Sequence, residues 1–303
     1  MFLLLFFSTL PLFGLVLIGY FAGKFSMLDR SDAKVLLRLV GIIIVPFFGI
    51  KIIGNFRYEF VNWSLYWTYF FAQSMIYLSG FSLAKILFKR SHPEAIIIGM
   101  TSAFSNHLFF VYPIALFEFG AKDIVPIETI IAADFITVAL SVCALDITSQ
   151  KTFNLKVVLI KQLYNPALIG LFLGLMVQLS NLTLPQIFLR LVDFVCNAGT
   201  PVALIAMGIL LSFSTNKTQL VLSILISLLK IVTFPIILLL LLLYFNFDMS
   251  ISTTTLMVSA APIGAMGLVF AAIYNITTDA VVRSGVITYI LALISIPLVG
   301  TIF

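Results

Sequence analysis

Apolar runs long enough to cross a lipid bilayer follow one another along this 303-residue chain. A helix needs roughly 20 mostly apolar residues to cross the hydrocarbon core, and the chain contains about ten such runs. Only 10% of the residues are charged, whereas soluble domains carry about 25%. The sequence therefore predicts an all-α polytopic membrane protein. We expect its ten transmembrane helices at residues 3–23, 35–54, 65–88, 94–119, 124–147, 157–179, 187–212, 218–245, 250–274 and 281–302.

The connections between these runs are too short to hold a soluble domain. Residues 1–303 are therefore predicted to form a single transmembrane domain without a catalytic or nucleic-acid-binding appendage. The net charge of +5 is interpreted through membrane topology, not through nucleic acid. Cys143 and Cys196 both lie within predicted helices, where cysteine usually packs as a small apolar residue. No cofactor and no metal site are expected.

The two halves of the chain resemble each other in their prolines and glycines. Three positions recur with the same residue after an offset of 155: Pro11 and Pro166, Gly19 and Gly174, and Pro46 and Pro201. Five helices in each half place the second half in the membrane in the opposite orientation. We therefore predict two inverted five-helix repeats, at residues 1–147 and 157–302, with a binding site between them.

The basic residues predict the orientation of the chain in the membrane. Twelve lysines and arginines fall on one predicted side and four on the other, while Lys230 lies within a helix and is assigned to neither. Because cytoplasmic loops carry the excess of basic residues, both termini are expected on the non-cytoplasmic side. We expect a multi-pass protein of the cell membrane, typical of a bacterial inner membrane.

The fourth and ninth predicted helices carry the marks of interrupted helices. Pro113 follows a polar stretch that contains Ser102, Ser105 and Asn106. Proline removes a backbone donor, and the freed groups must find partners at membrane depth. The three polar side chains could supply them. The alternative is that prolines in membrane helices only produce kinks.

The ninth helix contains Pro262, with Gly264 and Gly267 close behind it. These glycines permit unwinding or the close approach of a second backbone. We expect the interruptions in the fourth and ninth helices to cross near the midplane and to form the substrate site.

Three titratable side chains lie inside predicted helices. Asp134 is predicted to carry a proton or a cation, or else to make a structural hydrogen bond. Lys230 lies deep in the eighth helix, where it could pair with Asp134 or attract an anionic substrate. His107 follows Asn106 and is expected to be a neutral hydrogen-bonding residue, with a pH-sensitive gate as the alternative.

The sequence from Asn197 to Leu204 resembles the seventh-helix motif of the auxin efflux carrier family, which is related to the bile acid:sodium symporters. Asn106 and Pro113 have the spacing of its fourth-helix motif, and the stretch from Pro262 occupies the place of its ninth. The resemblance implies helices 1, 2, 6 and 7 as a dimerising scaffold. It implies helices 3–5 and 8–10 as a moving transport domain, with helices 4 and 9 broken and crossing.

The resemblance also has departures. The stretch at residues 107–112 is bulky where the family is usually rich in glycine. Residues 71–77 lack the Asp and Lys that plant members carry in the third helix. The ninth-helix motif has Ile263 and Met266 in place of a second proline and an asparagine. The pocket is therefore expected to be more apolar than in other members.

These features together predict a secondary transporter, and not an enzyme, for a small organic anion, most simply a carboxylate. It would work by alternating access as a homodimer, driven by protons or by the membrane potential. A sodium-coupled symporter is the alternative, with oxygen ligands from Ser102, Ser105, Asn106 and Thr137. A non-transporting receptor or scaffold is the alternative of another class. The sequence contains no phosphate-binding Gly-Lys-Ser/Thr motif and no His-Glu-x-x-His motif.

Overall fold

The computed structural model describes residues 1–54, 59, 61–120, 124–149, 164–180, 184–213, 219–276 and 279–301. The regular elements of these ranges are all helices, as expected for the all-α class. Six helical stretches are long and apolar enough to cross a membrane: Phe2–Lys24, Arg30–Gly54, Trp63–Leu87, Gln186–Ser212, Leu220–Tyr244 and Asp279–Val299. Shorter apolar helices lie among them, which confirms a multi-pass membrane protein.

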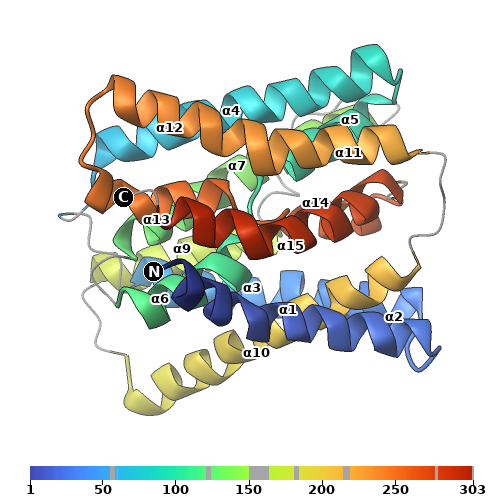
Figure 1. The fold of residues 1–303 in the computed structure, drawn as a ribbon. Coiled ribbons are helices and arrows are strands. Elements are labelled where there is room, and N and C mark those ends of the chain that lie inside the picture. Colours follow the sequence, from blue (N-terminus) through green and yellow to red (C-terminus); the bar gives the residue numbers. More distant parts are fainter. Residues whose placement is uncertain are drawn as a thin grey trace.

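Several of the long stretches contain a π-helical turn. They join α2 (Arg30–Leu39), η1 (Val40–Ile44) and α3 (Val45–Gly54); α4 (Trp63–Ser82) and η3 (Leu83–Leu87); and α11 (Leu220–Leu228), η6 (Leu229–Thr233) and α12 (Phe234–Tyr244). The uninterrupted helices are α1 (Phe2–Lys24), α7 (Val125–Ser149), α9 (Pro166–Ser180), α10 (Gln186–Ser212) and α15 (Asp279–Val299). Most of them run roughly parallel or antiparallel along the long direction of the bundle in Figure 1.

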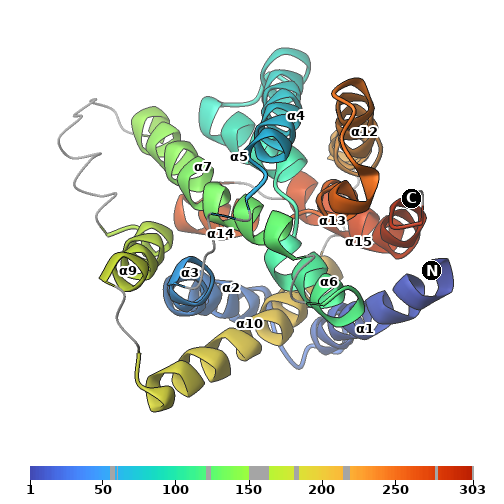
Figure 2. The same ribbon diagram turned by 90° about the vertical axis from the view of Figure 1, so that its left-hand side faces the viewer.

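Two helices are broken in the middle. The first consists of α5 (His92–Ala103), η4 (His107–Val111) and α6 (Tyr112–Glu118), with a non-helical segment at residues 104–106. The second consists of α13 (Met249–Ser259) and α14 (Met266–Ile273), with a non-helical segment at residues 260–265. Seen along the bundle, their half-helices lie between α4 and α12 on one side and α1, α2 and α10 on the other (Figure 2).

Local sequence signals determine where several helices begin. The Ser91 hydroxyl accepts a hydrogen bond from the Glu94 backbone, and the Glu94 carboxylate accepts one from the Ser91 backbone. Asp29 and Asp32 form the same reciprocal arrangement at the start of α2. Such capping boxes satisfy backbone donors that have no partner within the helix. They determine the residues at which α2 and α5 begin.

Glycines permit two close helix pairs, α1 against α10 and α3 against α9. A Cβ atom on Gly19 of α1 would collide with the Ile205 backbone of α10. A Cβ atom on Gly174 of α9 would collide with the Gly49 backbone of α3. The recurring glycines of the two halves therefore lie at corresponding helix contacts, where small residues let two backbones approach.

Both termini lie toward the same end of the bundle (Figure 1). The connection from α1 to α2 lies at the opposite end, between Lys24 at the end of α1 and Arg30 at the start of α2. The positions of the termini are consistent with an even number of membrane crossings. Which end faces the cytoplasm remains a prediction from the basic residues.

Candidate functional site

The two non-helical segments pair with each other through their backbones. The Asn106 amide donates to the Pro262 carbonyl at 2.8 Å, and the Gly264 amide donates to the Phe104 carbonyl at 2.9 Å. Ser105 and Ile263 thereby form an isolated antiparallel β-bridge. Each interruption thus supplies the hydrogen-bond partners that the other lacks. Peptide groups left unpaired inside a membrane cost free energy, and this pairing avoids that cost. We call residues 104–106 and 260–265 the crossover.

Gly264 is required for this close pairing. A Cβ atom at Gly264 would lie 2.9 Å from the Ser105 carbonyl oxygen and 3.5 Å from that of Phe104. The Ile263 amide also donates to the Thr288 hydroxyl of α15, at 3.3 Å. The crossover is therefore held both by its partner segment and by the neighbouring helix.

Two details predicted from the sequence are wrong. The chain does not open at Pro113, which lies in α6 directly after the π-helical turn η4. The side chains of Ser102 and Asn106 also do not satisfy the freed backbone: Ser102 donates to the Ile98 carbonyl of its own helix at 2.9 Å, and Asn106 donates elsewhere. The two extended segments lie close enough for their peptide groups to pair directly.

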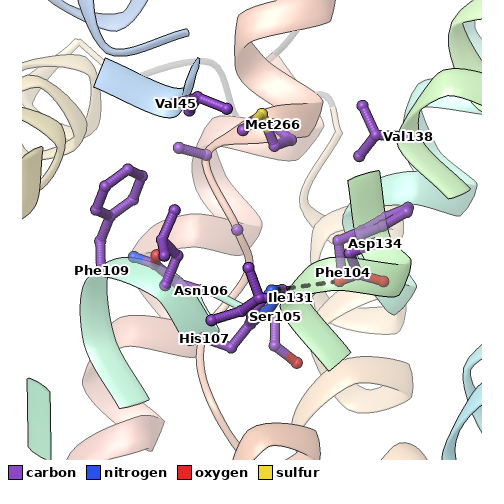
Figure 3. Close-up of a pocket in the computed structure, with 13 residues that line it drawn as sticks. Val45, Phe104, Ser105, Asn106, His107, Phe109, Ile131, Asp134, Val138 and Met266 are labelled. Atoms are coloured by element: carbon purple, nitrogen blue, oxygen red, sulfur yellow. Dashed lines mark ion pairs between the residues drawn. The ribbon is translucent and has the colours of Figure 1, made fainter. Parts of the chain in front are cut away.

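A buried cavity of about 60 Å³ adjoins the crossover. Asn106, His107 and Asp134 are among its polar lining residues, while apolar side chains such as Phe109 and Val138 cover much of the wall (Figure 3). Gly264 also lines it. Thr137, Pro113 and Ser102 do not belong to the lining. The wall of the cavity is therefore mainly apolar.

Asp134 joins three helical elements at this cavity. Its Oδ1 atom accepts a hydrogen bond from Gln73 Nε2 of α4 at 3.0 Å. Its Oδ2 atom lies 3.4 Å from His107 Nε2 of η4, which is ion-pair distance if the imidazole is protonated (Figure 3). All three side chains are buried. A carboxylate and an imidazole held in contact can exchange a proton without large movements of the chain.

Unpaired polar atoms gather at the same place. Ser105 Oγ, His107 Nδ1 and Asp134 Oδ2 are buried and have no hydrogen-bond partner of ordinary geometry within the described ranges. All three residues line the cavity. Because buried polar groups are nearly always paired, their concentration here marks a place that suits a polar ligand, an ion or water.

Asn106 is anchored by a residue that the sequence analysis did not single out. Its Nδ2 atom donates to the Tyr289 hydroxyl of α15 at 2.6 Å. The Tyr289 ring also packs edge-on against Phe110. Both Asn106 and Tyr289 are buried. Gln73 was missed in the same way, and the only signal for either residue was a polar group in a mostly apolar helix.

Lys230 lies beside the second segment of the crossover. It is fully buried, and its Nζ atom donates to the Ser259 carbonyl at 2.5 Å, at the last residue of α13. The end of a helix carries partial negative charge, so an amino group there is favourably placed. The ion pair with Asp134 does not form, since the carboxylate of Asp134 contacts Gln73 and His107 instead.

Similarity to known proteins extends over most of the chain. The sequence profile of a family described as "Membrane transport protein" matches residues 4–117 and 141–299. A protein of Rhizobium meliloti (strain 1021), named "Putative malonate transporter", is 23% identical over 220 residues, which cover 69% of this chain and 67% of that protein.

Proposed function

Since the chain belongs to the membrane transport protein family, the family of the auxin efflux carriers, we propose that it is a secondary transporter for a small organic anion, specifically a carboxylate. The observation that carries this proposal is the crossover with its adjoining cavity. Transporters typically bind substrate where discontinuous helices meet at the interface of two repeats. Here the broken helices pair at Ser105 and Ile263, beside a cluster of buried polar groups.

Two inverted five-helix repeats account for the packing. On this assignment, α1 to α3 with α9 and α10 form the scaffold, and the remaining helices form the transport domain. The symmetric contacts made by Gly19 and Gly174 support the assignment, because each joins the first helix of one repeat to the second helix of the other. The scaffold would also mediate a homodimer, as the family resemblance implies.

Alternating access follows from the size of the cavity. Pockets that hold small ligands usually measure about 300–1,000 Å³, whereas the cavity at the crossover measures about 60 Å³. A carboxylate can enter only if the helices around the crossover separate from the scaffold. In the proposed mechanism this structure represents a closed conformation, which would open toward each side of the membrane in turn.

His107 and Asp134 favour proton coupling over sodium coupling. A sodium site needs several oxygen ligands around one point, but Asp134 Oδ2 faces an imidazole nitrogen at 3.4 Å. Ser102, an expected oxygen ligand, donates within its own helix and does not line the cavity. A carboxylate and a histidine in contact are instead suited to taking up and releasing a proton.

The proposed substrate class rests on the hydrogen-bond donors at the crossover and on the name of the Rhizobium meliloti relative. Two hydrogen-bond donors at the crossover support an anionic substrate: the Asn106 amide, which bonds to Tyr289, and the Lys230 amino group, which bonds to the Ser259 carbonyl next to it. The Rhizobium meliloti relative carries malonate in its name. We propose a small dicarboxylate, with malonate as the first compound to test.

Uptake by the purified protein in lipid vesicles tests the proposal. Malonate uptake should follow an imposed pH gradient and should not depend on sodium. Asp134→Asn keeps the shape but cannot carry the proton, so we expect pH-driven uptake to fall at least tenfold while exchange of malonate across the membrane persists. Asn106→Ala should abolish both activities.

Asp193→Asn provides the matched control, because Asp193 pairs with Lys51 in the scaffold, away from the crossover. It should retain both activities. Unchanged pH coupling in Asp134→Asn would remove Asp134 from the mechanism. A folded wild-type protein that transports no carboxylate would favour the receptor or scaffold alternative.

A further inference from the structure

A second cavity, of about 280 Å³, lies between α2, α10, α14 and α15. It contains four polar lining residues among apolar ones: Arg30, Lys34, Asn275 and Asp279. The beginnings of α2 and α15 lie at the end of the bundle opposite the termini (Figure 1). This cavity is therefore distinct from the crossover, and it borders both the scaffold and the transport helices of our assignment.

An ion pair bridges the two parts across this cavity. Arg30 Nη2 of α2 lies 3.1 Å from Asp279 Oδ1 of α15. Their side chains are 41% and 39% exposed. Ion pairs with this much exposure contribute little to stability, because water screens them and solvates both groups when they separate. A carboxylate from solution can therefore replace Asp279 on Arg30 at small cost.

The cavity carries more positive than negative charge. Arg30 and Lys34 line it with a single carboxylate, that of Asp279. Lys34 forms no ion pair with any residue that the structure describes, and its side chain is exposed. Residues four apart on a helix share one face, so the two cations lie about one turn apart. That spacing suits an anion with two carboxylates.

We propose that this cavity is a second binding site, which receives a small dicarboxylate before it reaches the crossover. One carboxylate binds Arg30 in place of Asp279, the second binds Lys34, and the Asn275 amide supplies a further hydrogen bond. Loading thereby replaces the ion pair between Arg30 of α2 and Asp279 of α15, a contact between the scaffold and the transport helices of our assignment. The ligand class rests on the proposed function, while the site itself rests on the cavity and its charges.

Malonate binding to the purified full-length protein, measured by titration calorimetry, tests the site. Arg30→Gln should weaken binding by roughly tenfold, because it removes a charged hydrogen-bond partner of the ligand. Asp279→Asn should strengthen binding several-fold, since the ligand then has no competitor for Arg30. Lys34→Gln should weaken the binding of malonate more than that of acetate, which has one carboxylate.

Arg38→Gln is the matched control, because Arg38 lies one turn further along α2 and does not line the cavity. It should leave malonate binding unchanged. The opposite signs of Arg30→Gln and Asp279→Asn separate a ligand site from a structural ion pair, since loss of a structural pair acts in the same direction from either side.

The outcomes for this site and for transport are separable. Binding with the expected opposite shifts, but without uptake into vesicles, would support the site and contradict the transport proposal. Uptake by the wild type, together with binding that Arg30→Gln and Asp279→Asn leave unchanged or shift in one direction, would overturn the site alone. Absence of malonate binding to the wild-type protein would also overturn it.

Discussion

At the scale of single residues, buried polar side chains distinguish this protein from a simple bundle of apolar helices. Gln73 and His107 both contact Asp134 beside the crossover. Asn106 is held by Tyr289, and Lys230 is held by the Ser259 carbonyl. None of these groups would be stable alone in an apolar surrounding, so each depends on a partner from a different helix.

Tyr289→Phe tests this dependence. The substitution keeps the ring that packs on Phe110 but leaves the Asn106 amide without its acceptor. An unsatisfied buried group costs about 1–3 kcal/mol. We expect thermal unfolding in detergent at a lower temperature, together with slower malonate uptake.

Tyr244→Phe serves as the control for that change, because the Tyr244 side chain is 77% exposed. It should change neither the unfolding temperature nor the uptake. Equal effects of the two substitutions would mean that the hydroxyl of Tyr289 has no special part in holding Asn106.

At the scale of elements, the interruptions replace helical hydrogen bonds with bonds between two segments distant in sequence. Residues 104–106 and 260–265 are both non-helical, and their peptide groups pair with each other across the crossover. Neither segment can keep its extended conformation alone, because its peptide groups would face an apolar surrounding. The two broken helices are therefore interdependent.

Gly264→Ala and Pro113→Ala test where the helices are interrupted. Gly264 lies in a non-helical segment, whereas Pro113 lies in a helix although its sequence suggests an interruption. Alanine at position 264 places a Cβ atom 2.9 Å from the Ser105 carbonyl oxygen, which we expect to lower stability by about 1–3 kcal/mol and to abolish malonate uptake. Pro113→Ala should keep most of the stability and most of the malonate uptake, since Pro113 lies within α6. Thermal unfolding and vesicle uptake provide the measurements.

Gly14→Ala is the control for an added methyl group, because nothing lies within 4 Å of a Cβ atom at Gly14. It should behave as the wild type. A Pro113→Ala protein that loses transport while Gly264→Ala retains it would reverse our assignment of the interruption.

At the scale of the whole molecule, helix contacts connect the two halves of the chain. α1 packs on α10, and α3 packs on α9, so each half supplies part of the scaffold of our assignment. The Arg30 and Asp279 pair adds a link that can be broken at the basic end of the bundle. A transport domain that moves against such a scaffold needs contacts of both kinds.

The orientation of the molecule can be measured with fused reporters. Alkaline phosphatase is active only outside the cytoplasm, so we expect activity when it follows Phe303 and none when it follows Phe213. A fluorescent protein that folds only in the cytoplasm should give the reverse pattern at the same two positions. The opposite results would invert the topology derived from the basic residues.

The class of the protein can be predicted from its sequence alone. Apolar length predicts membrane helices because hydrocarbon admits few other structures, and the structure confirms the all-helical class. Asn106, Ser105, His107 and Asp134 were also named from sequence, because polar groups inside membrane helices are costly and therefore conspicuous. The structure places all four around one cavity.

Which polar groups contact one another depends on how the helices pack, and the sequence does not predict it. Pro113 and Pro262 looked equivalent in sequence, yet only Pro262 lies in a non-helical segment. Lys230 donates to the Ser259 carbonyl and not to Asp134. Tyr289 accepts a hydrogen bond from Asn106, and Gln73 donates one to Asp134. Local sequence shows which conformation a residue prefers and that burying its polar group costs free energy. Its hydrogen-bond partner on another helix depends on how the helices pack.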